Sequence, residues 1–146
     1  MNIDVDTSAV LKLWIDEPQA EAVRLSLEDA AQIASSVLAR VEAASMLARL
    51  VRERRVSAAH SGLMKAEAEF HFSRIRLIEI NGEAVALAEQ LCALHQLKSL
   101  DALHLATALI LRALEPTPLV FMTFDLKLGR AAAAEGLDVW PDLGQR

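Results

Sequence analysis

The sequence has a single cysteine, Cys92, few aromatic residues and no long apolar run. One cysteine excludes an internal disulfide and a cysteine-rich zinc site, and it is typical of a reducing compartment. No apolar run reaches the roughly 18 residues that a membrane span needs. The first residues, Met1-Asn2-Ile3-Asp4, carry an acid where a signal peptide carries basic residues. These absences predict a cytoplasmic protein that does not enter a membrane.

What the chain does contain is hydrophobic residues, which make up 53% of its 146 positions. This hydrophobic content is enough for one sizeable core, but the chain is too short for two ordinary domains. We therefore expect a single domain over residues 1–146. The mean hydropathy of +0.28 is high for a small monomer and predicts an apolar surface that meets a partner. The net charge of −5, from 15 basic and 20 acidic residues, argues against a nucleic-acid binder held by a broadly basic surface.

Short apolar runs alternate along the chain with longer patterns of helical periodicity. Proline near a helix start, as in Glu17-Pro18, and glycine after a helix end, as at Gly136, mark several boundaries. Strands separated by helices imply parallel pairing with helices on both faces, so we predict a three-layer α/β/α domain. The expected strands are 2–5, 32–35, 75–80, 119–123 and 137–140. The expected helices are 8–14, 17–28, 37–54, 83–95, 100–114 and 125–135. A further helix is capped by Ser57 and reaches residue 72.

Four acidic residues fall at element ends or inside apolar helices. Asp6 and Asp125 each follow a strand, Asp101 opens the most apolar helix, and Glu42 lies in the stretch Val41-Glu42-Ala43-Ala44. Ligands of parallel sheets bind beyond the carboxyl ends of the strands, so we expect these acids to converge there. Converging carboxylates repel one another unless a hard cation such as Mg²⁺ or Mn²⁺, which prefers oxygen ligands, holds them.

Each of these acids also has an ordinary structural interpretation. Asp6, Asp101 and Asp125 suit the N-cap position of a helix, and Glu42 suits a solvated helix position. The metal-site hypothesis therefore depends on the joint placement of all four.

The ordered set of motifs around these acids resembles the PIN-domain ribonucleases, and especially the toxins called VapC. The opening Asp6-Thr7-Ser8-Ala9-Val10-Leu11-Lys12-Leu13 is similar to the opening of that family, and Val41-Glu42 is similar to its second acidic position. The later motifs are Leu100-Asp101-Ala102-Leu103-His104-Leu105-Ala106-Thr107-Ala108 and Thr123-Phe124-Asp125, followed by Lys127-Leu128-Gly129-Arg130-Ala131-Ala132 and Gly136-Leu137. The resemblance covers nearly the whole chain, from Asp6 to Val139.

This resemblance implies a parallel five-stranded sheet, an RNA endonuclease that depends on Mg²⁺ or Mn²⁺, and a cognate antitoxin protein. By position it implies that Asp6, Glu42, Asp101 and Asp125 are the metal-binding and catalytic acids. Thr7 or Ser8, together with Thr123, match hydroxyl positions expected to orient the carboxylates. The chain departs from the family at Asp4, where the first strand usually has an apolar residue, so the pairing and exposure of that strand are in question.

Two other functions are open on the sequence. Asp4-Val5-Asp6-Thr7 fits the DxDxT motif of haloacid-dehalogenase-like phosphatases, in which the first aspartate is phosphorylated, although only three residues precede it here. A catalytically idle PIN-fold binding module is the other alternative. In that case a partner would bind an apolar stripe on the helices. The same stripe could equally bind an antitoxin helix, form a homodimer interface or pack in the interior. Its residues are Leu47, Leu50, Val51 or Ala58, Leu63 and Met64.

The histidines and aromatic residues offer no further site in the sequence. His60, His71, His95 and His104 lack metal-ligand spacing, and we expect His104 to be a packed core residue. The aromatic residues are too few and scattered for a base-stacking platform, and most are expected in the core: Trp14, Phe70, Phe72, Phe121, Phe124 and Trp140.

The charge balance changes once the four candidate ligands are set aside. Without these four, the chain has 16 acidic and 15 basic residues. Bound cations would also make the site attractive to phosphate. Between Arg40 and Arg76 basic residues outnumber acidic ones, so a local basic surface is expected to approach RNA. Its basic members are Arg40, Arg49, Arg52, Arg54, Arg55, Lys65, Arg74 and Arg76.

Overall fold

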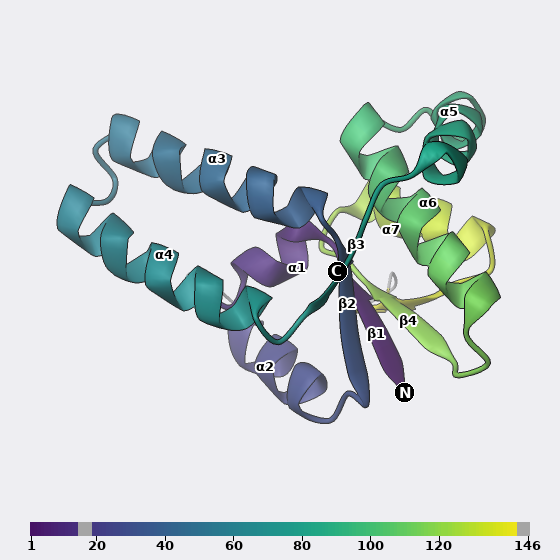
Figure 1. The fold of residues 1–146 in the computed structure, drawn as a ribbon, viewed down its shortest axis with the longest axis horizontal. Helices are drawn as coiled ribbons and strands as arrows, with labels where there is room; N and C mark the ends of the chain where they lie inside the picture. Colours follow the sequence, from purple (N-terminus) through teal and green to yellow (C-terminus); the bar gives the residue numbers. More distant parts are fainter. Residues whose placement is uncertain (15–18, 143–146) are drawn as a thin grey trace.

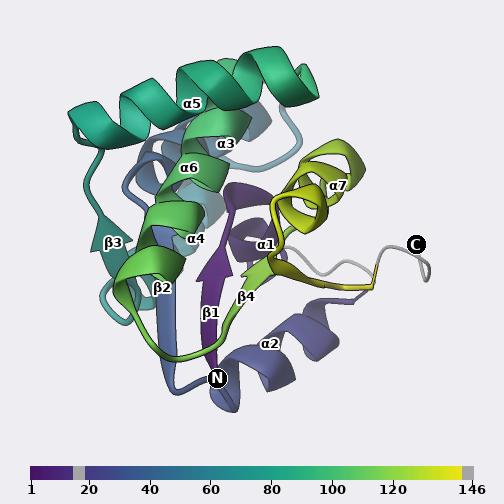
Figure 2. The ribbon, with the colours of Figure 1, turned by 90° about the vertical axis from the view of Figure 1, so that its right-hand side faces the viewer.

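A computed structural model describes residues 1–14 and 19–142 of the chain. In these ranges five strands form one sheet with the order β3-β2-β1-β4-β5, and every neighbouring pair is parallel. The central strand β1 pairs with β2 on one side and with β4 on the other (Figure 2). The strands are β1 (Asn2–Val5), β2 (Gln32–Ser36), β3 (Arg76–Ile78), β4 (Leu119–Met122) and β5 (Asp138–Trp140).

Helices cover both faces of this sheet, so the predicted three-layer α/β/α fold is confirmed (Figures 1 and 2). On one face lie α1 (Thr7–Leu11), α2 (Ala20–Glu28), α3 (Leu38–Arg52) and α4 (Ala58–Phe72). On the other face lie α5 (Gly82–His95), α6 (Ser99–Leu114) and α7 (Leu126–Ala134). Figure 1 shows α3 and α4 as a long hairpin that extends away from the sheet.

The boundaries differ from the prediction at several ends. The first helix is shorter than 8–14, because residues 12–14 continue it in tight turns whose N–H groups bond to carbonyls three residues earlier. The predicted start at Glu17-Pro18 lies outside the described residues, and α2 begins after Gln19. The edge strand β3 stops at Ile78, since β2, with which it pairs in the described part of the chain, ends at Ser36. Gly136 follows α7 at φ +80°, as expected of a glycine at a helix end.

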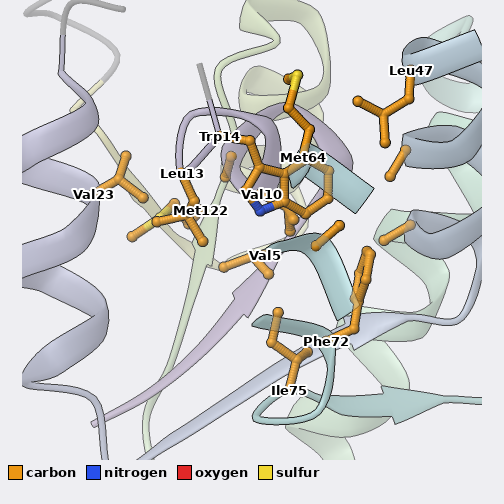
Figure 3. Packing of buried hydrophobic residues seen from close by; sticks show 14 of the residues in the cluster. Val5, Val10, Leu13, Trp14, Val23, Leu47, Met64, Phe72, Ile75 and Met122 are labelled. Carbon is orange, nitrogen blue, oxygen red and sulfur yellow. The ribbon is translucent and has the colours of Figure 1, made fainter. Parts of the chain in front are cut away.

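Alternation along the strands divides the interior into two cores. Ile3, Val5 and Met122 point toward α1–α4, where Trp14 meets the edge of Phe72 at a ring distance of 5.7 Å (Figure 3). Phe121 points to the opposite face, against α5, α6 and α7. Asp4 shares the face of Phe121, its partner in the register, and its side chain is fully buried. The departure at Asp4 therefore leaves the pairing of β1 regular.

The apolar stripe on α3 and α4 is mainly interior packing. Leu47, Leu50 and Met64 are buried in the core that the hairpin shares with α1 (Figure 3). Leu63 alone is strongly exposed among the leucines and methionine of this set, because it lies on the outer side of α4. Most aromatic residues are buried or half-buried as expected, but Phe70 is exposed. Within the described ranges, no helix combines the length and the apolar character needed to cross a membrane.

Candidate active site

The carboxyl edge of the sheet borders a hollow of about 540 Å³ that all four candidate acids line. Asp6 follows β1 and Asp125 precedes α7, and the parallel pairing of β1 with β4 brings these two residues from distant parts of the chain to one edge. Glu42 reaches the hollow from α3, and Asp101 reaches it from the first turn of α6. The convergence expected from the sequence is therefore observed.

Asp6 is held by hydrogen bonds on both carboxylate oxygens. Its Oδ1 accepts from the N–H of Ala9 at 3.0 Å, which caps α1, and from the hydroxyl of Ser8 at 2.7 Å. Its Oδ2 accepts from the hydroxyl of Thr123 at 2.6 Å. Burial raises the pKa of Asp6, while these three hydrogen bonds and the charge of His104 act in the opposite direction. Asp6 is thus fixed in place and costly to ionise without a neighbouring cation.

The two hydroxyls that hold Asp6 also hold the start of α7. Ser8 Oγ accepts the N–H of Phe124 at 2.8 Å, and Thr123 Oγ1 accepts the N–H of Asp125 at 3.1 Å. Asp125 in turn caps α7, because its Oδ1 accepts the N–H of Leu128 at 2.8 Å. Ser8 and Thr123 therefore link Asp6 to the backbone at the start of α7.

Glu42 is fixed by two side chains from distant segments. Its Oε1 accepts the hydroxyl of Thr7 at 2.7 Å and lies 2.6 Å from Nε2 of His104. Partial burial raises the pKa of Glu42, but the hydrogen bonds from His104 and Thr7 and the charge of His104 outweigh it, so the net pKa is lowered. Glu42 is therefore not the plain solvated position that its helix alone allows, and it stays ionised at neutral pH.

Asp101 differs from Asp6 and Asp125 because it does not cap its helix. The N-cap of α6 is Lys98, and Asp101 lies inside the first turn. Burial raises the pKa of Asp101, and the negative charges of Asp125, Asp6 and Glu42 raise it further, against an opposing effect of His104. The capping interpretation is thus wrong for Asp101, whose carboxylate is left to face the other acids.

The donors of this hollow fit a hard divalent cation. Four carboxylates from separate elements face one space, and their charges interact, as the pKa of Asp101 shows. In residues 1–14 and 19–142, no three acidic, histidine or cysteine side chains are close enough to enclose one ion as they stand. Binding Mg²⁺ or Mn²⁺ requires these carboxylates to draw together, which their mutual repulsion opposes until the cation is present.

Three cationic or polar residues of the hollow were not expected as site residues. His104 is buried as predicted, but it contacts Glu42 instead of serving only as packing. Its spacing of three residues from Asp101 on a helix was the available signal, since such residues share a face. Arg49 and Arg52 line the same hollow from α3. The sequence placed both in a basic stretch without assigning either to the acidic site.

The structure argues against the phosphatase alternative. Its nucleophile, Asp4, is fully buried in the central strand, and within the described residues neither carboxylate oxygen has a hydrogen-bond partner. Burial raises the pKa of Asp4 well above its ordinary value, and the charge of Asp6 adds to this. A nucleophile has to reach the substrate, and a carboxyl group that is fully enclosed in the central strand does not.

Comparisons with known proteins agree with the observed fold. The structure is similar to a chain of a toxin-antitoxin complex from Klebsiella pneumoniae (20% identity, TM-score 0.62, 86% of this chain and 88% of that one). It is also similar to chains of VapBC2 from Rickettsia felis bound to a promoter DNA fragment (14%, 0.66, 95% and 97%) and of FitAcB from Neisseria gonorrhoeae (18%, 0.68, 99% and 99%). A search of curated proteins finds no match. The family model described as "PIN domain" matches residues 3–134, so the chain belongs to the PIN-domain family.

Proposed function

We propose that this protein is a metal-dependent endoribonuclease that hydrolyses RNA phosphodiester bonds. The observation that carries the proposal is the convergence of Asp6, Glu42, Asp101 and Asp125 on one hollow at the carboxyl edge of the sheet. We assign these four acids as the residues that hold Mg²⁺ or Mn²⁺. Such a cation supplies a bound water of lowered pKa and neutralises charge on phosphate oxygens.

Asp6 and Glu42 have different tasks in this proposal. Asp6, held on both oxygens by Ser8, Ala9 and Thr123, provides a ligand whose direction is fixed before the cation binds. Glu42 remains ionised because its pKa is lowered, so its carboxylate accepts a hydrogen bond from the attacking water. Thr7 and His104 keep that carboxylate in one orientation.

The arginines of the hollow supply the complementary charge for a polyanionic substrate. Arg49 and Arg52 lie on α3, beyond Glu42, and both line the hollow. A guanidinium group binds phosphate through paired hydrogen bonds, so these residues position the RNA backbone beside the acids. This local arrangement explains how a chain with a net charge of −5 can approach RNA.

We further propose that the protein is the toxin of a type II toxin–antitoxin pair. The supporting observation is the similarity of its fold to chains from solved toxin-antitoxin, VapBC2 and FitAcB structures. In this proposal a cognate antitoxin protein covers the active hollow or its surroundings and inhibits cleavage. Purifying the chain with and without its genomic neighbour, and measuring mass and RNA cleavage together, tests for such a partner.

The central experiment compares the native protein with an Asp6→Asn variant on RNA in the presence of Mn²⁺ or Mg²⁺. Asparagine keeps the capping role at position 6 but removes the ligand charge, so the variant is expected to fold normally and to lose cleavage. Gel analysis of RNA fragments measures cleavage, and circular dichroism checks folding. Full activity of Asp6→Asn with added Mg²⁺ contradicts the assignment, and inactivity of the native protein favours the binding-module alternative.

A further inference from the structure

We propose that a groove beside the active hollow binds the single-stranded RNA segment that flanks the scissile phosphate. This inference rests on the proposed ribonuclease function and specifies where its substrate runs. The groove has a volume of about 540 Å³ and lies between α1, the α3–α4 hairpin and the start of α7. We call it the flanking groove, and its cationic side chains are Lys12, Arg49, Arg55 and His60.

The flanking groove adjoins the carboxylate hollow. Ser8, Leu11, Met46 and Arg49 line both spaces, so the two lie side by side. Ser8 donates to Asp6 on one side and accepts the N–H of Phe124, which lines the groove, on the other. A strand whose phosphate lies among the carboxylates can therefore extend past these shared residues into the groove.

The charge of the groove is complementary to a polyanion. Among the described residues, the lining includes two arginines, a lysine and a histidine, and no aspartate or glutamate. Arg49 and Arg55 each lie 4.0 Å from Glu53, and all three side chains are about half exposed or more. Exposed pairs of this length are weak and screened, so RNA phosphates can replace Glu53 as the partner.

The floor of the groove suits bases better than a further row of phosphates. Leu50, Met64 and Trp14 are buried beneath it, and the half-buried ring of Phe124 lies 5.0 Å from Nζ of Lys12. Apolar and aromatic surface beside cations is the arrangement that single-stranded binders use, with bases on the floor and phosphates at the rim. Only unpaired bases can lie on such a floor, so the occupant we propose is a single strand and not a duplex.

An acidic peptide is the competing occupant, because the same cations would bind its carboxylates. The position of the groove beside the carboxylate hollow favours RNA, since a cleaved strand must extend on at least one side of the scissile phosphate. A test therefore measures both ligands on the same variants.

The experiment measures fluorescence anisotropy of a labelled single-stranded RNA of roughly 12 nucleotides over a range of salt concentrations. The groove variant is Arg49→Ala with Arg55→Ala, and the charge-matched control is Arg24→Ala with Arg130→Ala, on α2 and α7. Every protein carries Asp101→Asn and the buffer contains a chelator, so that no strand is cut. A labelled acidic peptide containing leucines is titrated in parallel.

The groove variant is expected to bind RNA roughly tenfold more weakly at low salt, with a slope of log K against log salt reduced by about 1.4, because each lost phosphate contact removes about 0.7 from the slope. The control pair is expected to keep the slope. The proposal is overturned when groove and control pairs bind RNA alike, or when the groove pair weakens only the peptide. RNA cleavage by the native protein with Mn²⁺, measured separately, reports on the ribonuclease function independently of this result.

Discussion

His104 Nε2 lies 2.6 Å from Glu42 Oε1, and this contact joins α6 to α3 across 62 positions of the sequence. The same carboxylate oxygen accepts the hydroxyl of Thr7. Because an ionised carboxylate only accepts hydrogen bonds, His104 must donate from Nε2. The imidazole is almost fully buried, so the pair is a fixed part of the site and not a surface ion pair.

Replacing His104 tests whether it positions Glu42 for catalysis. His104→Leu keeps the volume but removes the donor, and we expect RNA cleavage to fall about 10- to 100-fold with a higher requirement for Mn²⁺. His104→Gln retains an amide donor and is expected to recover part of the activity. Cleavage rates measured over a range of Mn²⁺ concentrations distinguish the two variants.

A second histidine provides the matched control for this test. His95 Nε2 lies 2.6 Å from Glu135 Oε1, between α5 and the end of α7 and away from the hollow. His95→Leu therefore breaks an equivalent contact and is expected to leave the Mn²⁺ dependence unchanged. The melting temperatures of both leucine variants are measured as well. If His95→Leu and His104→Leu lose RNA cleavage equally, and each loss follows the drop in melting temperature, the result contradicts a positioning role for His104.

Asp101→Asn is expected to change how a divalent cation affects stability. Burial raises the pKa of Asp101, and the charges of Asp125 and Asp6 raise it further, so removing the charge of Asp101 relieves repulsion when no cation is present. We expect the metal-free variant to melt at least as high as the native protein. It should gain less on addition of Mn²⁺, since a ligand that binds more weakly stabilises the folded state less. Thermal unfolding with and without Mn²⁺ measures both effects.

The control for this experiment is Glu83→Gln, which removes an exposed acid from the first turn of α5. Like Asp101, it lies in the first turn of its helix, but it does not line the hollow. An identical response of Glu83→Gln and Asp101→Asn to Mn²⁺ argues against Asp101 as a ligand.

The strands and the four acids of the hollow could be predicted from the sequence. Asp6 and Asp125 could be placed together because parallel strands bring their carboxyl ends to one edge, and because a capping aspartate marks where a helix begins. Glu42 and Asp101 stood out as charges inside apolar helices.

The contact between His104 and Glu42 could not be predicted in this way. Whether a histidine on an apolar helix packs or donates depends on which helix crosses it, and periodicity carries no such information. The same holds for Arg49, because its position in the hollow depends on the direction in which α3 leaves the sheet. The sequence thus predicted the four acids and the hydroxyls beside them, whereas the contacts of His104 and Arg49 depend on tertiary packing.

Metal affinity is expected to fall as the pH is lowered. The pKa of Asp6 and the pKa of Asp101 are both raised, each chiefly by burial, so protons compete with the cation at a higher pH than for exposed aspartates. Above the raised pKa values both carboxylates are ionised and binding is independent of pH. Calorimetric titration with Mn²⁺ in buffers of different protonation enthalpy measures the protons released, and Asp101→Asn is expected to release fewer.

Asp4→Val is expected to stabilise the protein at neutral pH. Asp4 is fully buried, shares its face of the sheet with Phe121, and within the described residues its carboxylate oxygens have no hydrogen-bond partner. Leaving such a group unsatisfied costs about 1–3 kcal/mol, and valine fills the same space with apolar atoms in a strand that favours β-branched residues. Urea unfolding at pH 7 measures the gain, and Asp138→Val, on the exposed side of the edge strand β5, is the control.

The gain from Asp4→Val is expected to depend on pH with a definite sign. Burial raises the folded-state pKa of Asp4 well above its ordinary value of 3.8, so the folded native protein binds a proton that the unfolded chain releases. Native stability therefore falls as the pH rises from about 4 toward the raised pKa, while the valine variant lacks this loss. The difference between the two proteins should be smallest near pH 4 and largest at neutral pH. A difference that grows on acidification would show that Asp4 is stabilised as a carboxylate, which its burial on an apolar face opposes.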